Sequence, residues 1–451
     1  MSRIVFLLWC LLPAAAQAAA NIHEYRLANG LKLVVQEDHR APVVVSQIWY
    51  KVGSSYEHNG ITGISHVLEH MMFKGTRKHG PNEFSRLIAA AGGRENAFTA
   101  DDYTAYFQRL ERSRLELAFE LEADRMRNLV LDPVESAKET RVVMEERRMR
   151  VEDKPQSLTW EQFQATAFLA NPYRIPTIGW MADLESLTPA DLRAWYDQWY
   201  LPNNATLVVV GDVDADAVRE LAERHFGPVR PGPVGVVKPQ PEPRQRGERR
   251  IVVRAPAELP YLALGWKVPG LKTAPAPWQA YALRVLAGIL DDGDSARLSR
   301  ELVRGQAVAA AADADYSIYT RMDGLFTLDG VPANGHTVAE LEAALRAQVE
   351  RLKTEPVTPA ELERVKAGVV AADVYQRDSS FYQAMRIGIL ESIGLGWPVM
   401  EDYVDRIQAV TERQVQAVAR LYLRDEGLTV ARLEPLPLET AGDEGGERHA
   451  R

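Results

Sequence analysis

The sequence predicts an α+β protein of two homologous domains, each a mostly antiparallel sheet packed with helices, joined by a proline-rich linker. At 451 residues the chain is too long for one ordinary domain. Features of the first part recur later in the same order and at a nearly constant offset, which indicates a duplication. The matching pairs are Trp49 with Trp266, Gly179-Trp180 with Gly396-Trp397, and residues 187–201 with residues 410–423. Between the copies, residues 228–250 contain six prolines, typical of a semi-stiff exposed linker.

The elements of the first copy follow from local patterns. Strands are predicted where β-rich runs are bounded by turn residues, and helices where apolar residues recur with a helical period. Thr188-Pro189 is a helix start signal, and Gly92-Gly93 a helix stop. In chain order we expect strands at 27–36 and 43–52, helices at 64–73 and 81–91, an extended strand pair at 96–110, helices at 115–129, 133–151 and 189–200, and a buried strand at 205–211.

The first eighteen residues carry the pattern of a secretory signal. Arg3 precedes an apolar run at 4–12, and Ala16-Gln17-Ala18 forms a cleavage signature. The run is shorter than the roughly 20 residues that span a bilayer, so we expect export, with the periplasm as destination, and no stable membrane anchor. The only cysteine, Cys10, lies in this segment. A mature chain without thiols excludes disulfides, cysteine zinc sites and cysteine nucleophiles.

Composition narrows the class further. Hydrophobic residues make up 46% and charged residues 25%, as in soluble globular proteins. The formal net charge of -9 offers no basic face, so nucleic acid is not expected as a partner.

The residues with the clearest chemistry lie on the helix after the second predicted strand, in the run His66-Val67-Leu68-Glu69-His70. His66 and His70 are four apart and share one helix face, so both can bind one ion. Glu69 stands on the same side, where a carboxylate can accept a proton from metal-activated water. The five-residue pattern alone is weak, because histidine pairs also occur on ordinary polar faces.

A catalytic zinc site needs a third protein ligand and an open fourth position. Glu139 and Glu146 are seven residues apart on a predicted helix, so both can face one site, whereas Glu145 points elsewhere. The alternative is a solvated charged face, because Arg141, Arg147 and Arg148 lie nearby.

The runs from His66 to Thr76, Asn96-Ala97-Phe98-Thr99 with Tyr103-Thr104, and Glu139 to Glu146 together resemble the pitrilysin/insulinase superfamily of zinc metallopeptidases. The chain is similar to its short bacterial and mitochondrial-processing-peptidase-like form over essentially its whole mature length. The resemblance implies one Zn²⁺ per chain bound by His66, His70 and Glu146, with Glu69 as general base and Glu139 orienting a ligand. Asn96, Ala97, Phe98 and Thr99 resemble the family's substrate-binding edge strand, although Phe98 could equally be a core residue.

The second domain departs from this pattern. Its stretch 280–288 has no histidine. The family often uses this domain to supply an Arg and a Tyr, seven apart, that bind the substrate carbonyl, but in the corresponding stretch 297–310 Val303 and Ala310 occupy those positions. Shifting the alignment to Arg297, Arg300 or Arg304 supplies no tyrosine. We therefore expect a homologous partner subunit that supplies the pair; Tyr316 or Tyr319 could replace the tyrosine, which leaves a homodimer open.

These interpretations predict a secreted zinc metalloendopeptidase that acts on peptides as the metal-bearing subunit of a heterodimer. The alternatives are a non-catalytic scaffold subunit and a zinc hydrolase of non-peptide substrates. The predicted divisions are a signal peptide at 1–18, a catalytic zinc domain at 19–227, the linker at 228–250, a homologous domain without metal at 251–439, and a flexible tail at 440–451.

Overall fold

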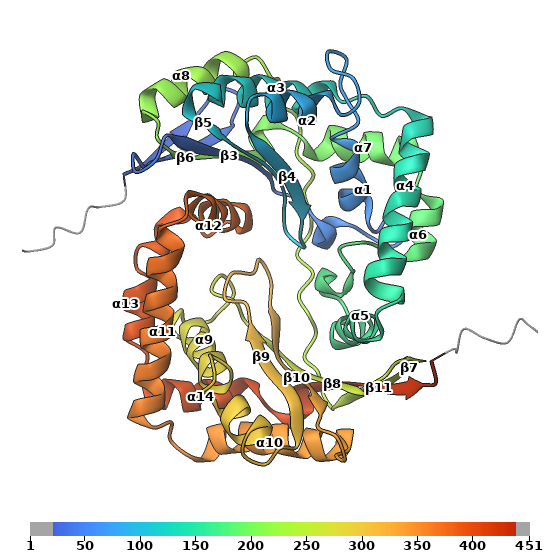
Figure 1. The fold of residues 1–451 in the computed structure, drawn as a ribbon, viewed down its shortest axis with the longest axis vertical. Helices are drawn as coiled ribbons and strands as arrows, with labels where there is room; N and C mark the ends of the chain where they lie inside the picture. Colours follow the sequence, from blue (N-terminus) through green and yellow to red (C-terminus); the bar gives the residue numbers. More distant parts are fainter. Residues whose placement is uncertain (1–20, 439–451) are drawn as a thin grey trace, which may run out of the picture.

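The computed structural model describes residues 21–438 and folds them into two halves of matching design that face each other (Figure 1). The predicted signal at 1–18 and tail at 440–451 lie outside the described residues. The sheet of the first half has the order β1-β2-β6-β3-β5-β4, and that of the second half β7-β11-β8-β10-β9. Apart from β1, the two orders correspond strand for strand. The predicted α+β fold of two homologous sheet-and-helix domains is therefore confirmed.

All strand pairs are antiparallel except β2 with β6 and β7 with β11. The first sheet contains β1 (Ile22–Arg26), β2 (Lys32–Glu37), β3 (Val43–Tyr50), β4 (Arg94–Thr99), β5 (Thr104–Glu111) and β6 (Ala205–Gly211). The second contains β7 (Arg249–Pro256), β8 (Tyr261–Val268), β9 (Ala309–Tyr316), β10 (Gly324–Pro332) and β11 (Leu428–Leu436).

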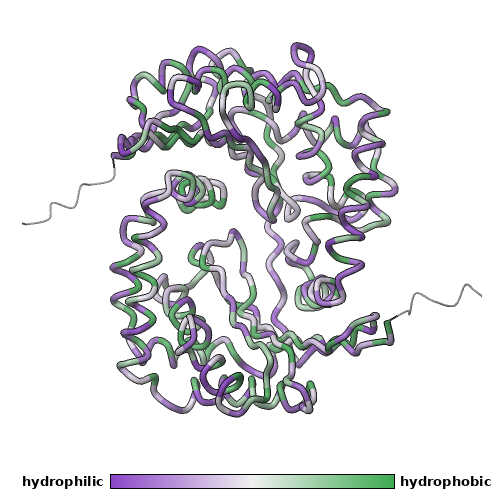
Figure 2. Tube along the Cα trace, viewed as in Figure 1, coloured by the Kyte–Doolittle hydropathy of each residue, from purple (hydrophilic) through white to green (hydrophobic). Residues whose placement is uncertain are grey.

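Helices cover the sheets, and Figure 2 shows the hydrophobic stretches gathered in the strands and in the helix faces packed on them. Several helices begin with a threonine capping box, including those that follow Thr188 and Thr411. The first half contains α1 (Ile64–Met71), α2 (Glu83–Ala90), α3 (Leu115–Asn128), α4 (Pro133–Arg147), α5 (Pro155–Ala167), α6 (Met181–Ser186), α7 (Pro189–Trp199) and α8 (Ala215–His225). The second contains α9 (Trp278–Leu290), α10 (Val338–Thr354), α11 (Pro359–Arg377), α12 (Ser380–Ile393), α13 (Tyr403–Gln408) and α14 (Glu412–Tyr422).

Two predicted elements differ from the structure. The strand expected over 27–36 is wrong in its first part, because Asn29-Gly30 forms a hairpin turn between β1 and β2. The turn places Gly30 at φ 89° and joins the Leu27 amide to the Leu31 carbonyl at 2.9 Å. The helix expected over 133–151 is α4 followed by a short π-helix, η3 (Arg148–Glu152).

One helix of each half packs on the sheet of the other half. Helix α12 of the second half packs on β3 and β6 of the first sheet, and α5 of the first half packs on β7, β8 and β11 of the second (Figure 1). Ala384 and Ile387 thereby join a core with Trp49 and Val208, and Phe163 joins a core with Ala263. The two sheets thus depend on each other's helices for cover.

Glycines make both helix contacts close. A Cβ on Gly388 of α12 would overlap the Trp49 ring, and one on Gly265 of β8 would overlap the Phe163 ring of α5. The bulky residue is on the sheet in the first contact and on the helix in the second. The two helix-to-sheet contacts therefore pair a glycine with an aromatic ring in opposite arrangements.

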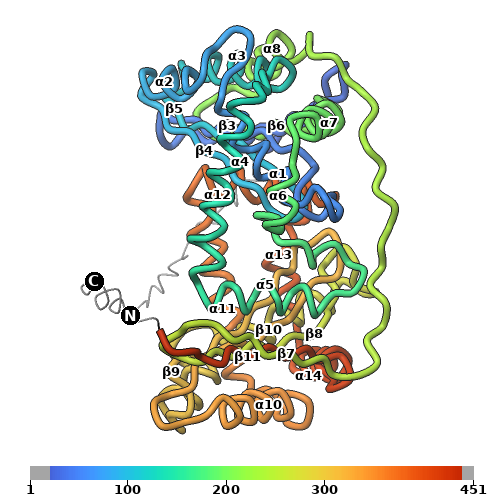
Figure 3. The backbone as a smooth tube through the Cα atoms, turned by 90° about the vertical axis from the view of Figure 1, so that its right-hand side faces the viewer, coloured from blue at the N-terminus to red at the C-terminus, as the bar shows by residue number. Residues whose placement is uncertain are grey.

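The connection between the halves has no helix or strand from the end of α8 to the start of β7. It runs extended along one side of the molecule (Figure 3). Glu242 ties it to the first half by accepting hydrogen bonds from the amides of Leu169, Ala170 and Asn171 at 2.8–3.0 Å.

Candidate metal centre and active-site cleft

Helix α1 presents the two histidines. It begins after Gly63, whose φ of 83° lets the chain turn sharply into the helix. Glu57 accepts hydrogen bonds from the amides of Gly63 at 2.7 Å and Ser65 at 2.9 Å, and so caps the helix from a distance. The imidazoles of His66 and His70 lie 4.8 Å apart between ring centres and at 81° to each other.

Glu146, near the end of α4, faces both histidines. Its carboxylate oxygens lie 3.8 Å from His66 Nε2 and 3.5 Å from His70 Nε2. One donor atom from each of these three residues falls within 4.8 Å of the others. Ligand atoms around a tetrahedral zinc ion are roughly 3.3–3.6 Å apart, so two nitrogens and one carboxylate oxygen at these spacings fit such an ion.

Glu139 contacts His70 on the side of the ring that faces away from Glu146. Its Oε1 is 3.0 Å from His70 Nδ1, the nitrogen turned away from Glu146, and its Oε2 is 2.7 Å from Lys74 Nζ. A carboxylate in this position fixes the ring orientation and tautomer of a histidine ligand.

Glu69 lies on the cavity side of α1 and is only 9% exposed. Thr99 Oγ1 donates to its Oε2 at 2.7 Å, which leaves the other oxygen free of side-chain hydrogen bonds within the described residues. A buried carboxylate held by a single donor keeps a lone pair for a proton from a bound reactant.

The electrostatics match these positions. Burial, with the neighbouring His70 and Arg150, lowers the pKa of His66 to about 3, so this imidazole is neutral near pH 7, the form that binds metal. Burial also raises the pKa of Glu69, which makes it a better base, although the Thr99 hydrogen bond opposes the shift. The hydrogen bond to His70 lowers the pKa of Glu139 despite burial, and Lys74 adds to this effect.

The four residues of the predicted edge strand lie in β4, at the end of the first sheet, where β5 is their only strand partner among the described residues. Asn96, Ala97, Phe98 and Thr99 line a cavity of about 690 Å³ together with His66, Glu69, His70 and Glu146. Phe98 also packs edge-on against Trp49, with ring centres 5.4 Å apart. Phe98 therefore combines a packing contact with a place in the cavity wall.

Three polar residues at this site were not expected from the sequence. Lys74 holds Glu139, and Arg150 pairs with Glu146 at 2.7 Å; each stands four residues after a site residue, a spacing that could have revealed them. Arg321 reaches Asp102 beside β4 from the second half, at 2.9 Å. No local pattern could connect residues 219 positions apart.

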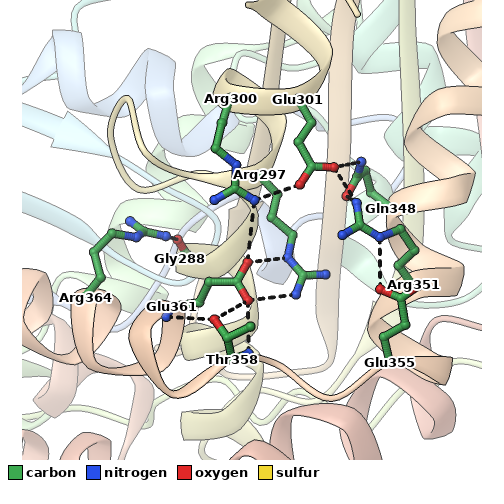
Figure 4. A network of polar contacts seen from close by, with 10 residues as sticks. All are labelled: Gly288, Arg297, Arg300, Glu301, Gln348, Arg351, Glu355, Thr358, Glu361 and Arg364. Atoms are coloured by element: carbon green, nitrogen blue, oxygen red, sulfur yellow. Dashed lines mark hydrogen bonds and ion pairs between the residues drawn. The ribbon is translucent and has the colours of Figure 1, made fainter. Parts of the chain in front are cut away.

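Within the described part of the second half, residues 249–438, no such constellation occurs. On α9, Leu283, Leu286 and Ala287 stand at the offset that relates Trp49 to Trp266, in place of His66, Glu69 and His70, and all three are buried. The arginines near the missing Arg/Tyr positions are engaged elsewhere (Figure 4): Arg297 pairs with Glu361 at 2.8 Å, and Arg300 with Glu301 at 2.7 Å.

Nor do the two candidate replacement tyrosines reach the cavity. The buried Tyr316 hydroxyl donates to the Pro269 carbonyl at 2.7 Å. The Tyr319 hydroxyl is also buried, and its ring lies beside Tyr403.

Comparisons with known proteins agree with this architecture. Residues 32–179 match the model of insulinase (peptidase family M16), and residues 186–369 that of the peptidase M16 inactive domain. The zinc protease PqqE of Helicobacter pylori is 34% identical over 378 residues, which cover 81% of this chain and 82% of that protein. The uncharacterized zinc protease YmxG of Bacillus subtilis is 26% identical over 91% of this chain and 98% of its own length.

Solved structures give the same result. The crystal structure of a protease from Helicobacter pylori has a TM-score of 0.87 at 30% identity and covers 92% of this chain and 100% of its own. The periplasmic protease PqqL of Escherichia coli, at a TM-score of 0.75 and 18% identity, covers 92% of this chain and 48% of its own, and shares the fold. Within residues 21–438, no helix has the length and apolar character needed to cross a membrane.

Proposed function

The chain belongs to the insulinase family of peptidases, peptidase family M16, and we propose that it is a zinc-dependent endopeptidase with one Zn²⁺ per chain. The observation that carries this proposal is the group of His66, His70 and Glu146 beside a cavity lined in part by β4, which is the edge strand of its sheet among the described residues. Relatives named zinc proteases support the choice of metal.

Each side chain has a role in the proposed reaction. Zinc, when bound, polarises the scissile carbonyl and lowers the pKa of the attacking water. Glu69 accepts the proton of that water and passes it to the leaving amine. Glu139 keeps His70 oriented, and the free edge of β4, from Asn96 to Thr99, pairs with the main chain of an extended peptide.

Replacing the base separates chemistry from metal binding. Glu69→Gln is nearly isosteric, and the Glu69 side chain is hydrogen-bonded to Thr99 rather than to the three proposed ligands. We therefore expect one zinc per chain and a kcat lowered by about a hundredfold to ten-thousandfold. Metal analysis together with cleavage of a quenched fluorescent peptide tests this. A metal-loaded variant with near wild-type turnover would remove Glu69 from the mechanism.

We also propose export to the periplasm and a homologous partner subunit that supplies an Arg/Tyr pair. The engagement of Arg297 and Arg300 in ion pairs, and the burial of the Tyr316 and Tyr319 hydroxyls, support the need for such a subunit. Co-purification of the native complex from a periplasmic fraction tests both ideas, and a fully active homodimer in solution would contradict the heterodimer.

A non-catalytic scaffold is the second candidate, because the model that matches residues 186–369 is that of an inactive domain. The two candidates differ in metal content and turnover. Purified protein with no bound zinc and no cleavage of peptides would favour the scaffold, and zinc-dependent cleavage of esters but not peptides would favour a non-peptide hydrolase.

A further inference from the structure

The loop between β9 and β10, residues 317–323, crosses from the second half to the end of β4 (Figure 1). Arg321 is its main contact. Its Nε donates to Asp102 Oδ1 at 2.9 Å, its Nη2 donates to Ser55 Oγ at 2.7 Å, and its guanidinium lies 4.3 Å from the centre of the Tyr56 ring. The second half thus places a cation on Asp102, the residue that directly follows the cavity-lining residues Ala100 and Asp101.

Asp102 is a buried hub for these contacts. Besides Arg321 Nε, it accepts hydrogen bonds from Ser55 Oγ at 2.8 Å, from the Arg321 amide at 3.2 Å and from the Tyr173 hydroxyl. Arg321 supplies the only cation in this set. Without it, a buried carboxylate would retain only neutral donors, which is costly.

Asp102 and its neighbours continue directly into the site. The amides of Ser54 and Ser55 donate to the carbonyls of Ala100 at 3.2 Å and Asp101 at 2.8 Å. The segment after β4 is therefore hydrogen-bonded to Ser54 and Ser55, and Arg321 contacts Ser55. Thr99, the last residue of β4, directly precedes this segment and donates to Glu69. Four consecutive residues thus link the contact with the second half to the proposed base.

We propose that Arg321 is a positioning residue through which the second half holds the end of β4, and with it Thr99 and Glu69, in working geometry. The expected change in kcat/KM rests on the proposed function. The expected change in hydrogen exchange at the end of β4 does not. Arg321 thereby gives the second half a positioning role in the site, although that half lacks the Arg/Tyr pair.

A second partly buried ion pair between the halves serves as a matched control. Lys32 on β2 pairs with Glu391 on α12 at 2.8 Å, with side chains 14% and 5% exposed, against 19% and 6% for Arg321 and Asp102. Strand β2 lies toward the opposite end of the first sheet from β4. Loss of this pair weakens the contact between the halves without touching the site.

The test compares Arg321→Gln with Lys32→Gln in the full chain by zinc content, thermal midpoint, kcat and KM on a peptide, and hydrogen exchange. We expect Arg321→Gln to keep one zinc per chain, to lose between about tenfold and a hundredfold in kcat/KM, and to show faster exchange at the amides of residues 100–103. Lys32→Gln should lower the thermal midpoint while kcat/KM stays within about twofold of wild type. Arg321→Lys keeps the charge but not the forked geometry, and should fall between wild type and Arg321→Gln.

Equal exchange at residues 100–103 in Arg321→Gln and Lys32→Gln would overturn the inference, whatever the activity of the chain. So would unchanged kinetics in a metal-loaded Arg321→Gln. A wild-type protein that holds zinc but cleaves nothing would instead defeat the proposed function, and the exchange comparison would still decide the role of Arg321. If Arg321→Gln does not fold, Arg321→Lys carries the same comparison.

Discussion

Helices α1 and α9 occupy equivalent places in the two halves, yet of the two only α1 carries side chains that can bind a metal or accept a proton. On α9 the three equivalent positions are apolar and buried, whereas α1 holds two histidines and a carboxylate against a cavity. On α11, counted from its first residue, Val365 and Ala372 stand where α4 has Glu139 and Glu146. The fold is therefore satisfied by an apolar central helix, and the polar cluster of the first half is an addition that folding does not require.

The largest effect is expected when a proposed ligand on α1 is replaced by its apolar counterpart on α9. His66→Leu, which copies Leu283, should abolish zinc binding and lower turnover by at least about a thousandfold, because a ligand is lost. Metal-free His66→Leu should unfold at or above the temperature of chelator-treated wild type, because a buried imidazole nitrogen without a protein partner is replaced by an apolar group. Metal analysis and thermal melts with and without chelator measure both effects.

A melt of metal-free His66→Leu well below that of chelated wild type would mean that the histidine itself supports the fold of α1. The same melts report metal linkage, since an ion bound only by the folded state raises the midpoint of wild type but not of the variant.

A smaller effect on zinc binding is expected for Glu139, which contacts the proposed ligand His70 but is not a proposed ligand itself. Glu139→Gln removes the charge next to His70 Nδ1 but keeps a hydrogen-bond acceptor, so zinc affinity should weaken by about tenfold to a hundredfold. Competition with a chromogenic chelator measures this affinity. Glu145→Gln, an exposed neighbour on the same helix, is the control and should bind zinc as wild type does.

The two exchanged helices provide a third test, on stability. Gly388→Ala should improve helix propensity by up to about 1 kcal/mol, but the overlap with Trp49 should cost about 1–3 kcal/mol, so the free energy of unfolding should fall. Gly265→Ala should behave alike through Phe163, whereas Gly247→Ala, where nothing lies close, should be nearly neutral. Denaturant titration of the three variants decides whether the two helix-to-sheet contacts are equally tight.

The smallest expected effect is a pH dependence in the second half. Burial raises the pKa of Asp329 from 3.8 to about 6. The folded chain then binds more protons than the unfolded chain between these values, so this group's contribution to the free energy of unfolding falls as pH rises from about 4 to 6. Asp329→Asn should flatten that part of the stability profile, and an unchanged slope in denaturant titrations would exclude Asp329 as its source.

Much of the molecule could be predicted because its signals are local. The duplication left paired tryptophans and capping residues, and the three proposed ligands with Glu69 and Glu139 lie on two helices at spacings that can be read from the chain. The exchange of α5 and α12 left no such pattern, since either helix could have covered its own sheet. The contact of Arg321 with Asp102 was equally hidden, and β1 was missed because the turn at Asn29-Gly30 was placed inside a strand.

The exchange of helices also determines how the chain unfolds. Because each sheet is covered by a helix of the other half, neither half has a complete core when separated, and the pair should unfold in a single cooperative transition. Proteolytic cutting of the extended connection between α8 and β7 should therefore leave two fragments that stay together. The two copies therefore form one thermodynamic unit, and any relative movement of the halves must preserve the packing of α5 and α12 on the opposite sheets.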